Sequence, residues 1–381
     1  MSTQTPKLFQ PIRVGNMDLQ HRIVLPPMTR YKASRTHVPA TSLVSQYYAQ
    51  RAHTPGTLLI TEATLIAPEA GGYRHTPGIW NDEQVEAWKP VADAVHVKGS
   101  YVFMQLWALG HSADPSVLEE EGGYPYVSAS AVATGTPATP RPTPGVQDPD
   151  LSKTLKPAPR ALSVEEIAQY VQWYAQAAKN AIRAGFDGVE IHGAFGYLPD
   201  QFLRSATNKR TDVYGGSVEN RIRFPLEIIE AVSRAIGQER LAYRITPWYP
   251  VLGVDTGDSI ETFSAFVSTV KTRFPRLAFL DIIEPRPTID GKLAEGKSND
   301  FLHEVLKNSD IRVMSAGGYL AESALKIAEE KGYLIGIGKW YIANPDIVYR
   351  IKEGIPLTEA IVETFYTPGN VAEGYIDYPF A

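Results

Sequence analysis

The sequence contains no cysteine among its 381 residues. This absence excludes disulfide bonds, thiolate metal ligands and a thiol nucleophile. A chain of this length can bury enough apolar surface to fold without covalent cross-links. The absence of cysteine is also compatible with a reducing cytoplasm, where we expect the protein to reside.

Long hydrophobic runs are absent as well. No apolar stretch approaches the ~20 residues that a membrane-spanning helix requires, and the first residues, MSTQTPKLFQ, include no apolar signal-peptide region. Excess positive charge is also lacking, because 37 Lys and Arg residues face 42 Asp and Glu residues and leave a net charge of −5. A nucleic-acid partner would require clustered positive charge. We therefore expect neither a membrane nor a nucleic acid as a partner.

Short apolar runs rich in Val, Ile and Leu recur along the chain, with helix-like stretches between them. The runs show little polar alternation, which is typical of strands buried on both faces of a parallel sheet. Eight such strands indicate a single-domain α/β fold, a (β/α)₈ TIM barrel over residues 1–381, whereas seven would favour an open doubly wound sheet. The eight runs are Ile23–Met28, Thr57–Thr64, Tyr101–Trp107, Gly188–Gly193, Leu241–Thr246, Leu277–Ile283, Arg312–Gly317 and Leu334–Lys339.

Three of the intervening helices have recognisable ends. Ser163 and Glu166 match a capping box at the start of a helix that stops at Gly185. A second helix is expected to begin at Asp258. The segment Ala321–Lys331 is a third, because it has lysine in its last turn and is followed by glycine.

Two segments depart from this alternation. Residues 111–160 follow the third strand and are rich in Pro, Thr, Ser and Gly, as in TGTPATPRPTPG. A connection this long is either a lid over the barrel mouth or a mobile surface insert. The final residues, GYIDYPFA, contain three aromatic side chains. We expect this end of the chain to pack against the barrel.

Residues 188–224 carry the strongest functional signal. An apolar strand leads directly into His192 and Tyr197, and a polar loop with paired glycines follows. Barrel enzymes place their catalytic side chains at the carboxyl ends of strands. His192 and Tyr197 are therefore the first candidates for catalysis.

Other strand ends also carry polar side chains. Pro27 and Thr29 follow the first strand, and Gln105 lies near the end of the third. A carboxamide at a barrel mouth can donate to and accept from the edge of a heterocycle, although a single glutamine more often has a structural role. Arg244 lies within the apolar fifth strand, where an arginine is costly to bury without an anionic partner.

The last two strands indicate an anion site. Gly317 and Gly318 follow the seventh strand, and Gly338 with Lys339 follow the eighth. Glycines let backbone N–H groups approach an anion, and barrels often bind phosphate after these two strands. Together these strand ends suit a phosphorylated, planar heteroaromatic cofactor better than a metal, because no His and carboxylate residues have the spacing of a local metal motif.

These residues resemble the old yellow enzyme family of FMN-dependent NAD(P)H ene-reductases, and fungal members most of all. The resemblance extends over nearly the whole chain. It implies a (β/α)₈ barrel that holds FMN non-covalently at the carboxyl ends of its strands. The matching pieces are PPMTR, LLITEAT, QLWALG, residues 188–224, AGGY and GYIDYPF.

The resemblance also implies roles for individual residues. NADPH or NADH would reduce FMN, and hydride would then pass to the β-carbon of an α,β-unsaturated carbonyl compound. His192 would bind the substrate carbonyl and Tyr197 would protonate the α-carbon, in a pocket shaped by Trp107 and Tyr378. The implied subunit state is a monomer or a homodimer. The implied FMN contacts are Pro27, Thr29, Ala63, Gln105, His192, Arg244, Gly317, Gly318, Gly338 and Lys339.

Two positions depart from the family pattern. Phe195 stands where such enzymes carry a second carbonyl-binding donor, and Lys339 stands where arginine is usual. A pocket with Phe195 either accepts bulkier, more apolar substrates for the same reaction or serves an FMN-dependent isomerase, desaturase or oxidase. From a different class, a flavin-free barrel aldolase or hydrolase could bind a phosphorylated substrate and use Lys339 as a Schiff-base lysine.

Overall fold

The computed structural model describes residues 5–133, 156–252, 256–285 and 296–381. Eight parallel strands form its central sheet, and the pairing of β4 with β6 closes this sheet into a barrel. The predicted (β/α)₈ barrel is therefore confirmed. The barrel strands are β3 (Ile23–Leu25), β4 (Leu58–Ile60), β6 (Tyr101–Trp107), β9 (Gly188–His192), β10 (Leu241–Ile245), β11 (Phe279–Ile283), β12 (Arg312–Ala316) and β13 (Leu334–Gly336).

Each predicted strand is present, but most strands are shorter than the apolar run from which they were predicted. β3 stops at Leu25 because Pro26 and Pro27 have no N–H group to continue the ladder. The run predicted over Thr57–Thr64 divides into β4 and the two-residue strand β5 (Thr64–Leu65). Apolar composition thus marks burial, while backbone hydrogen bonding sets the strand ends.

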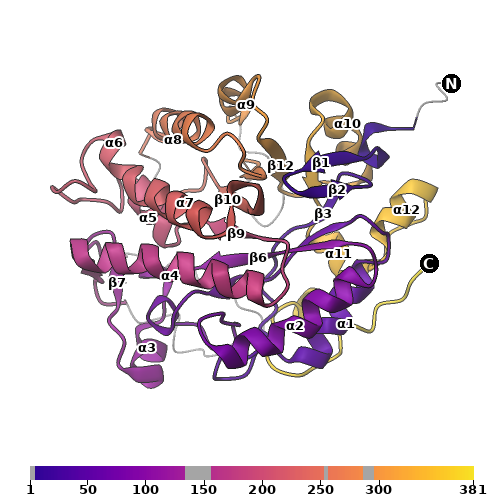
Figure 1. The fold of residues 1–381 in the computed structure, drawn as a ribbon, viewed down its shortest axis with the longest axis horizontal. Coiled ribbons are helices and arrows are strands. Elements are labelled where there is room, and N and C mark those ends of the chain that lie inside the picture. Colours follow the sequence, from indigo (N-terminus) through magenta and orange to yellow (C-terminus); the bar gives the residue numbers. More distant parts are fainter. Residues whose placement is uncertain (1–4, 134–155, 253–255, 286–295) are drawn as a thin grey trace.

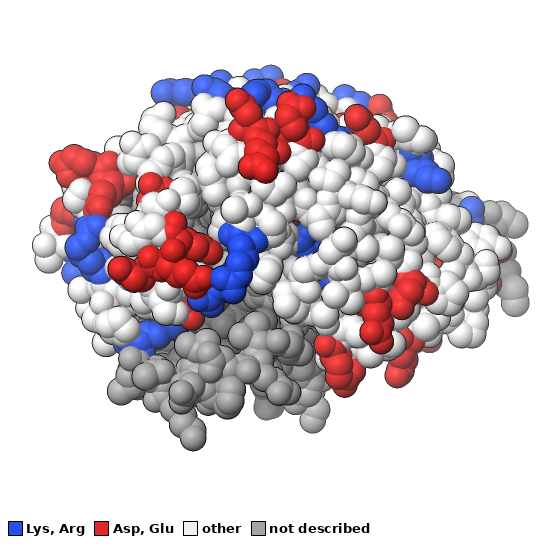
Figure 2. Space-filling view, turned by 90° about the horizontal axis from the view of Figure 1, so that it is seen from below, with Lys and Arg blue, Asp and Glu red and all other residues white. Residues whose placement is uncertain are grey.

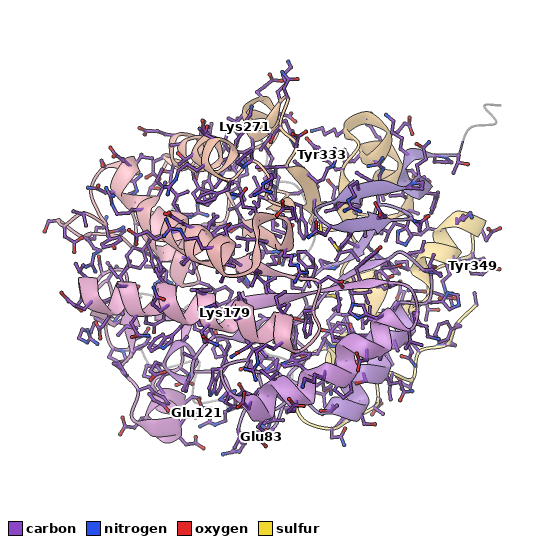
Figure 3. All side chains as sticks on the ribbon, in the orientation of Figure 1. Glu83, Glu121, Lys179, Lys271, Tyr333 and Tyr349 are labelled. Carbon is purple, nitrogen blue, oxygen red and sulfur yellow. The ribbon has the colours of Figure 1, made fainter. Side chains whose placement is uncertain are left out.

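Helices surround the barrel (Figure 1). The predicted capping box opens α4, where the Ser163 hydroxyl accepts from the Glu166 N–H at 3.2 Å and the Glu166 carboxylate accepts from the Ser163 N–H at 2.7 Å. The labelled Glu83 and Lys179 lie on the outer faces of α2 and α4 (Figure 3). The helices that follow the eight barrel strands are α1 (Thr41–Arg51), α2 (Asp82–His96), α4 (Val164–Arg183), α7 (Arg223–Ile236), α8 (Ser259–Arg273), α9 (Asp300–Leu306), α10 (Ala321–Lys331) and α12 (Ile347–Glu353).

Shorter elements lie in the connections. The predicted start at Asp258 and the predicted helix Ala321–Lys331 agree with α8 and α10. The short helices are α3 (Pro115–Gly122), α5 (Leu198–Leu203), α6 (Val218–Arg221) and α11 (Lys339–Ala343), and the 3-10 turns are η1 (Lys7–Phe9), η2 (Pro68–Ala70), η3 (Gly110–Ser112), η4 (Gln238–Arg240) and η5 (Val362–Thr364).

The amino-terminal end of the barrel is filled by apolar side chains. Phe103 and Phe279 meet there with ring centroids 5.6 Å apart, and both are fully buried. A hairpin formed by β1 (Ile12–Val14) and β2 (Met17–Leu19) packs its buried side chains into the same cluster. The hairpin closes this end, so polar chemistry is confined to the opposite end.

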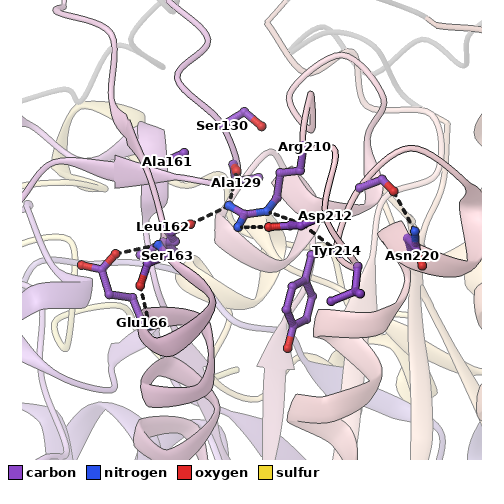
Figure 4. A network of polar contacts seen from close by, with 12 residues as sticks. Ala129, Ser130, Ala161, Leu162, Ser163, Glu166, Arg210, Asp212, Tyr214 and Asn220 are labelled. Carbon is purple, nitrogen blue, oxygen red and sulfur yellow. Dashed lines mark hydrogen bonds and ion pairs between the residues drawn. The ribbon is translucent and has the colours of Figure 1, made fainter.

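The segment 111–160 is described only in part, because residues 134–155 lie outside the described residues. Its described parts include α3, β7 (Val127–Ser128) and β8 (Arg160–Ala161), and β7 pairs with β8. Arg210 connects the two flanks, since its guanidinium donates to the carbonyls of Ala129 at 3.0 Å and Leu162 at 2.6 Å (Figure 4). The prediction that the segment is a lid stays a prediction.

The C-terminal segment packs against the barrel, as its aromatic residues indicated. Tyr375 is fully buried and stacks on Tyr47 of α1 with centroids 4.1 Å apart. Arg30 donates to the carbonyls of Phe365 at 2.8 Å and Gly374 at 2.7 Å. Charge-assisted bonds from the barrel thus satisfy the carbonyls of a segment that has little regular structure of its own.

The outer surface carries charges of both signs. On the face shown in Figure 2, basic and acidic side chains are interspersed, with broad uncharged areas between them. Among the described residues, no helix combines the length and the apolar composition needed to span a bilayer.

The packing at the closed end of the barrel predicts a large effect of Phe103→Ala. Removing this fully buried ring leaves a cavity among apolar neighbours, and we expect a loss of about 3–5 kcal/mol in the free energy of unfolding. The matched control is Val97→Ala, at a side chain 83% exposed, with an expected change within about 0.5 kcal/mol. Urea unfolding measures both, and equal effects would contradict a packed core at this end.

Candidate active site

The strand register brings polar side chains together inside the barrel as two pairs. Gln105 on β6 lies opposite Glu190 on β9, and Arg244 on β10 lies opposite Asp281 on β11. These side chains alternate with residues that face the helices, so they point inward, above the apolar layer. The predicted Gln105 and Arg244 therefore share a layer with two acids.

Arg244 has the anionic partners that its burial requires. Its Nε donates to Asp281 Oδ2 and lies 3.7 Å from Glu190 Oε1. Gln105 Nε2 donates to the same Glu190 oxygen at 2.7 Å. Burial raises the pKa of the Glu190 carboxyl well above its usual range, and the adjacent Asp281 carboxyl acts in the same direction. Burial also raises the pKa of Asp281, against the opposing effect of Arg244.

The two candidate catalytic residues lie in contact above this layer. The rings of His192 and Tyr197 have centroids 4.6 Å apart and are nearly perpendicular, at 79°. Trp107 at the end of β6 completes the group, with its ring 4.8 Å from that of Tyr197. Among the described residues, no group accepts a hydrogen bond from the buried Trp107 indole N–H. An aromatic cluster with polar edges thus stands at the carboxyl ends of β6 and β9.

Phe195 lies beside His192, in a strained backbone conformation. Its φ is 56°, a left-handed value that is uncommon for a bulky side chain. The Phe195 N–H donates to the Thr246 hydroxyl at 2.8 Å, and this bond fixes the turn. The Phe195 ring is 6.1 Å from His192 and 5.4 Å from Tyr249. The position therefore presents an aromatic face next to the candidate catalytic histidine.

The loop after β3 is anchored by a buried carboxylate. Glu62 Oε2 accepts from the N–H groups of Arg30 at 3.0 Å and Tyr31 at 3.2 Å, directly after the half-buried Pro27 and Thr29. Burial raises the pKa of Glu62 to about 7, although these hydrogen bonds act in the opposite direction.

The glycines after β12 and β13 have the conformations expected of an anion-binding turn. Gly317 and Gly318 have φ of 137° and 84°, which favour glycine. Among the described residues, no group accepts from the backbone N–H of Gly317, Gly318 or Gly338. A Cβ at Gly338 would lie 3.3 Å from Met28 Sδ, so this turn lies against the loop after β3. The exposed Lys339 follows as the first residue of α11.

The structure brings several of the predicted residues into contact. Ala63 is buried in the same apolar cluster as Trp107, with Tyr197 packed against it. Tyr378 packs against Ile342 and Ala343, in a cluster that Met28 also contacts, and its place in the substrate pocket stays a prediction. Its hydroxyl accepts from the Ile361 N–H at 2.9 Å, and this contact holds it in the C-terminal segment.

The comparisons with known proteins agree with this geometry. The family model described as the NADH:flavin oxidoreductase / NADH oxidase family matches residues 7–358. The chain belongs to this family. It is an old yellow enzyme-type flavin oxidoreductase.

Individual relatives extend the comparison. Chanoclavine-I aldehyde reductase fgaOx3 from Penicillium roqueforti is 45% identical over 98% of this chain and 96% of its own length. A probable inactive reductase, easA, from Epichloe festucae var. lolii is 42% identical over 99% of this chain and 96% of its own. The crystal structure of old yellow enzyme from Pichia sp. AKU4542 superposes with a TM-score of 0.85 at 37% identity, covering 98% of this chain and 94% of that one.

Sequence reasoning missed several residues of this oxidoreductase's site. Tyr73 contacts Trp107 with centroids 5.7 Å apart, and Tyr249 contacts Phe195, but both lie in irregular connections without a recognisable motif. Glu190 and Asp281 are inward positions of strands, and their alternation with Ile191 and Ile282 was a usable signal.

The raised pKa of Glu62 predicts a pH-dependent stability. The unfolded carboxyl ionises near pH 4.5 and the folded one near pH 7, so the contribution of Glu62 to stability falls as the pH rises between these values. Glu62→Gln cannot ionise and lacks this fall. Between about pH 5 and about pH 8, wild type should therefore lose about 2–3 kcal/mol more than the variant in the free energy of unfolding.

Urea unfolding of both proteins at the two pH values measures this difference. Parallel pH profiles for wild type and Glu62→Gln would show that the Glu62 carboxyl is ionised throughout. The exposed Glu83 supplies the control, since Glu83→Gln should leave the wild-type pH profile unchanged.

Proposed function

We propose that this protein is an FMN-dependent enzyme that uses NADPH or NADH to reduce the C=C bond of an α,β-unsaturated carbonyl compound. The observation that carries the proposal is the contact between His192 and Tyr197 at the strand ends, where His192 pairs in register with Arg244 and lies two residues beyond the partner of Gln105. Membership of a flavin oxidoreductase family supports it. We further propose a cytoplasmic monomer or homodimer, in keeping with the absence of cysteine.

The chain's own residues fit FMN. The three glycine N–H groups without an acceptor among the described residues suit a phosphate, and Lys339 adds a cation next to Gly338. The amide of Gln105 and the guanidinium of Arg244 suit the polar edge of a flavin ring. When bound, FMN would supply hydride transfer from the nicotinamide to the alkene.

The loop after β3 would form one wall of the flavin site. We assign contacts with the ring to Pro27 and Thr29, because Glu62 fixes the backbone immediately after them. Ala63 and His192 would line the same space, since Ala63 packs with Trp107 and Trp107 with His192. Trp107 and Phe195 would then shape the pocket for the substrate.

Two side chains would act on the substrate. His192 would hold its carbonyl oxygen by a hydrogen bond and withdraw charge from the alkene. The hydroxyl of Tyr197 would give its proton to the α-carbon as charge develops there. An ordinary tyrosine pKa near 10 suits this step, because a developing enolate is a strong base.

A second candidate function is specifically favoured by Phe195. This residue adds no donor beside His192, so the substrate carbonyl would be held by one side chain rather than two. Losing a donor of this kind typically costs about 10²–10³ in rate. An FMN-dependent isomerase, desaturase or oxidase has less need of the second donor, and one relative is described as a probable inactive reductase.

The assignment of Tyr197 as the acid predicts a selective defect in Tyr197→Phe. Alkene reduction should slow by about 10²–10⁴, the usual contribution of general acid catalysis. Reduction of the bound flavin by NADPH should keep its rate, because that step needs no tyrosine proton. Anaerobic stopped-flow spectroscopy follows both steps through the flavin absorbance.

The matched control is Tyr170→Phe, which removes a hydroxyl that donates to the Glu69 carbonyl on the outside of the barrel. Both half-reactions should keep wild-type rates in this variant. Wild-type reoxidation of Tyr197→Phe by an enal would show that another group is the acid. Colourless purified protein that releases no flavin on heating would reject the proposed function altogether.

The position of Phe195 predicts a gain of function in Phe195→Asn. Asparagine tolerates a left-handed φ and supplies the missing donor, so turnover of cyclohexenone should rise by up to about 10²–10³. The measurement is kcat/KM with cyclohexenone and with cinnamaldehyde. Phe195→Ala separates the two effects, because it removes the ring without adding a donor. An equal gain in both variants would assign the limitation to the ring and not to hydrogen bonding.

A further inference from the structure

Three ionisable side chains are enclosed together inside the barrel, and their charges do not balance if all are ionised. Glu190, Arg244 and Asp281 have exposed fractions of 0%, 6% and 0%. They come from three adjacent strands. The register pairs Arg244 with Asp281, and Arg244 Nε lies 3.7 Å from Glu190 Oε1. Two acids therefore share one cation, beneath the site assigned above to the flavin ring.

The hydrogen bonds around these acids are incomplete. Glu190 Oε1 accepts from Gln105 Nε2, and Asp281 Oδ2 accepts from Arg244 Nε. The other oxygen of each acid, Glu190 Oε2 and Asp281 Oδ1, is buried and has no donor among the described residues. Both carboxyl groups lie against the same guanidinium nitrogen, because Arg244 Nε donates to Asp281 Oδ2 and lies 3.7 Å from Glu190 Oε1. A single proton between them would satisfy both oxygens, since a protonated carboxyl is a donor.

Among the described residues, no second cation is paired with either acid. Gln105 faces Glu190 from β6 and is neutral, and Met314 on β12 is apolar and lies opposite Asp281. His192 is the next inward residue along β9, and its ring packs against Trp107 and Tyr197. Two carboxylates this close in a buried site cannot both be ionised at low cost.

We propose that Glu190 and Asp281 hold one proton between them, so that the triad with Arg244 is electrically neutral. The effect on the flavin rests on the proposed function, because it requires FMN to bind next to Arg244. An uncompensated arginine would stabilise the reduced, anionic flavin and make it a weaker hydride donor. The acid pair cancels that charge. Glu190 and Asp281 are thus positioning residues that keep the reduction potential of the flavin low.

The proposal makes an unusual prediction for a double-mutant cycle on the FMN-loaded enzyme. In Glu190→Gln the remaining Asp281 is ionised and balances Arg244, and in Asp281→Asn the remaining Glu190 loses its proton and does the same. Each single variant should therefore leave the flavin midpoint potential close to wild type. The double variant leaves Arg244 unbalanced and should raise the potential clearly. Upward shifts of similar size in both single variants would mean that both acids are ionised, and would overturn the proposal.

A second measurement does not depend on the flavin. The infrared C=O stretch of a protonated carboxylic acid should be present in wild type and lost in either single variant, because each leaves one ionised acid. Spectra at about pH 8 avoid interference from Glu62, whose pKa is about 7. A wild type without the band, or a band that persists in both single variants, would overturn the proposal even if the double variant fails to fold.

The control is another buried ion pair. Asp346→Asn removes the carboxylate that accepts from Arg350 Nε at 2.7 Å on α12, outside the barrel. This variant should change neither the midpoint potential nor the infrared band. The midpoint potential and the infrared band also allow the shared proton to be tested separately from the proposed FMN-dependent function. Protein that holds no FMN but shows the expected band pattern would reject the proposed function and retain the shared proton.

Discussion

The site depends on the register of four parallel strands. β6, β9, β10 and β11 align so that Gln105 lies opposite Glu190 and Arg244 opposite Asp281, and Arg244 joins the two pairs inside the barrel. A shift of one residue in any strand would turn a buried charge toward the packed helices and an isoleucine or leucine into the polar layer. The hydrogen-bonded ladder therefore fixes the chemistry of the interior, and the aromatic cluster of Trp107, His192 and Tyr197 is built on top of that layer.

The apolar end, the polar side chains and the loops of the barrel have different roles. The apolar end around Phe103 and Phe279 supplies stability, and the polar layer supplies a fixed charge distribution. The loops above carry residues that hydrogen bonds hold in uncommon conformations, as the Thr246 hydroxyl holds Phe195. Strain of this kind persists only where the scaffold beneath it is rigid. The closed barrel is that scaffold.

Sequence alone predicted the barrel, its eight strands and the proximity of His192 to Tyr197, because each depends on local patterns: apolar runs, capping residues and a motif within one connection. The hairpin of β1 and β2 was missed because neither strand is an apolar run: each has an exposed charged residue, Arg13 or Asp18, at its centre. The role of Tyr378 in the substrate pocket stays a prediction, since the path of the C-terminal segment is set by distant donors such as Arg30 and not by its own sequence. The position of Arg244 in an apolar strand predicted an anionic partner. The sequence pattern did not show whether this partner is a carboxylate on the neighbouring strand or a bound ligand.

The hairpin also has a consequence for how molecules reach the interior. It seals one end of the barrel with Val14, Met17 and Leu19, all buried. Among the described residues, the opposite rim is the end that no such hairpin seals, so a small molecule that reaches the interior enters and leaves on that side. Selectivity for such molecules falls on the connections at that rim, which can diverge in sequence while the strands below them stay unchanged.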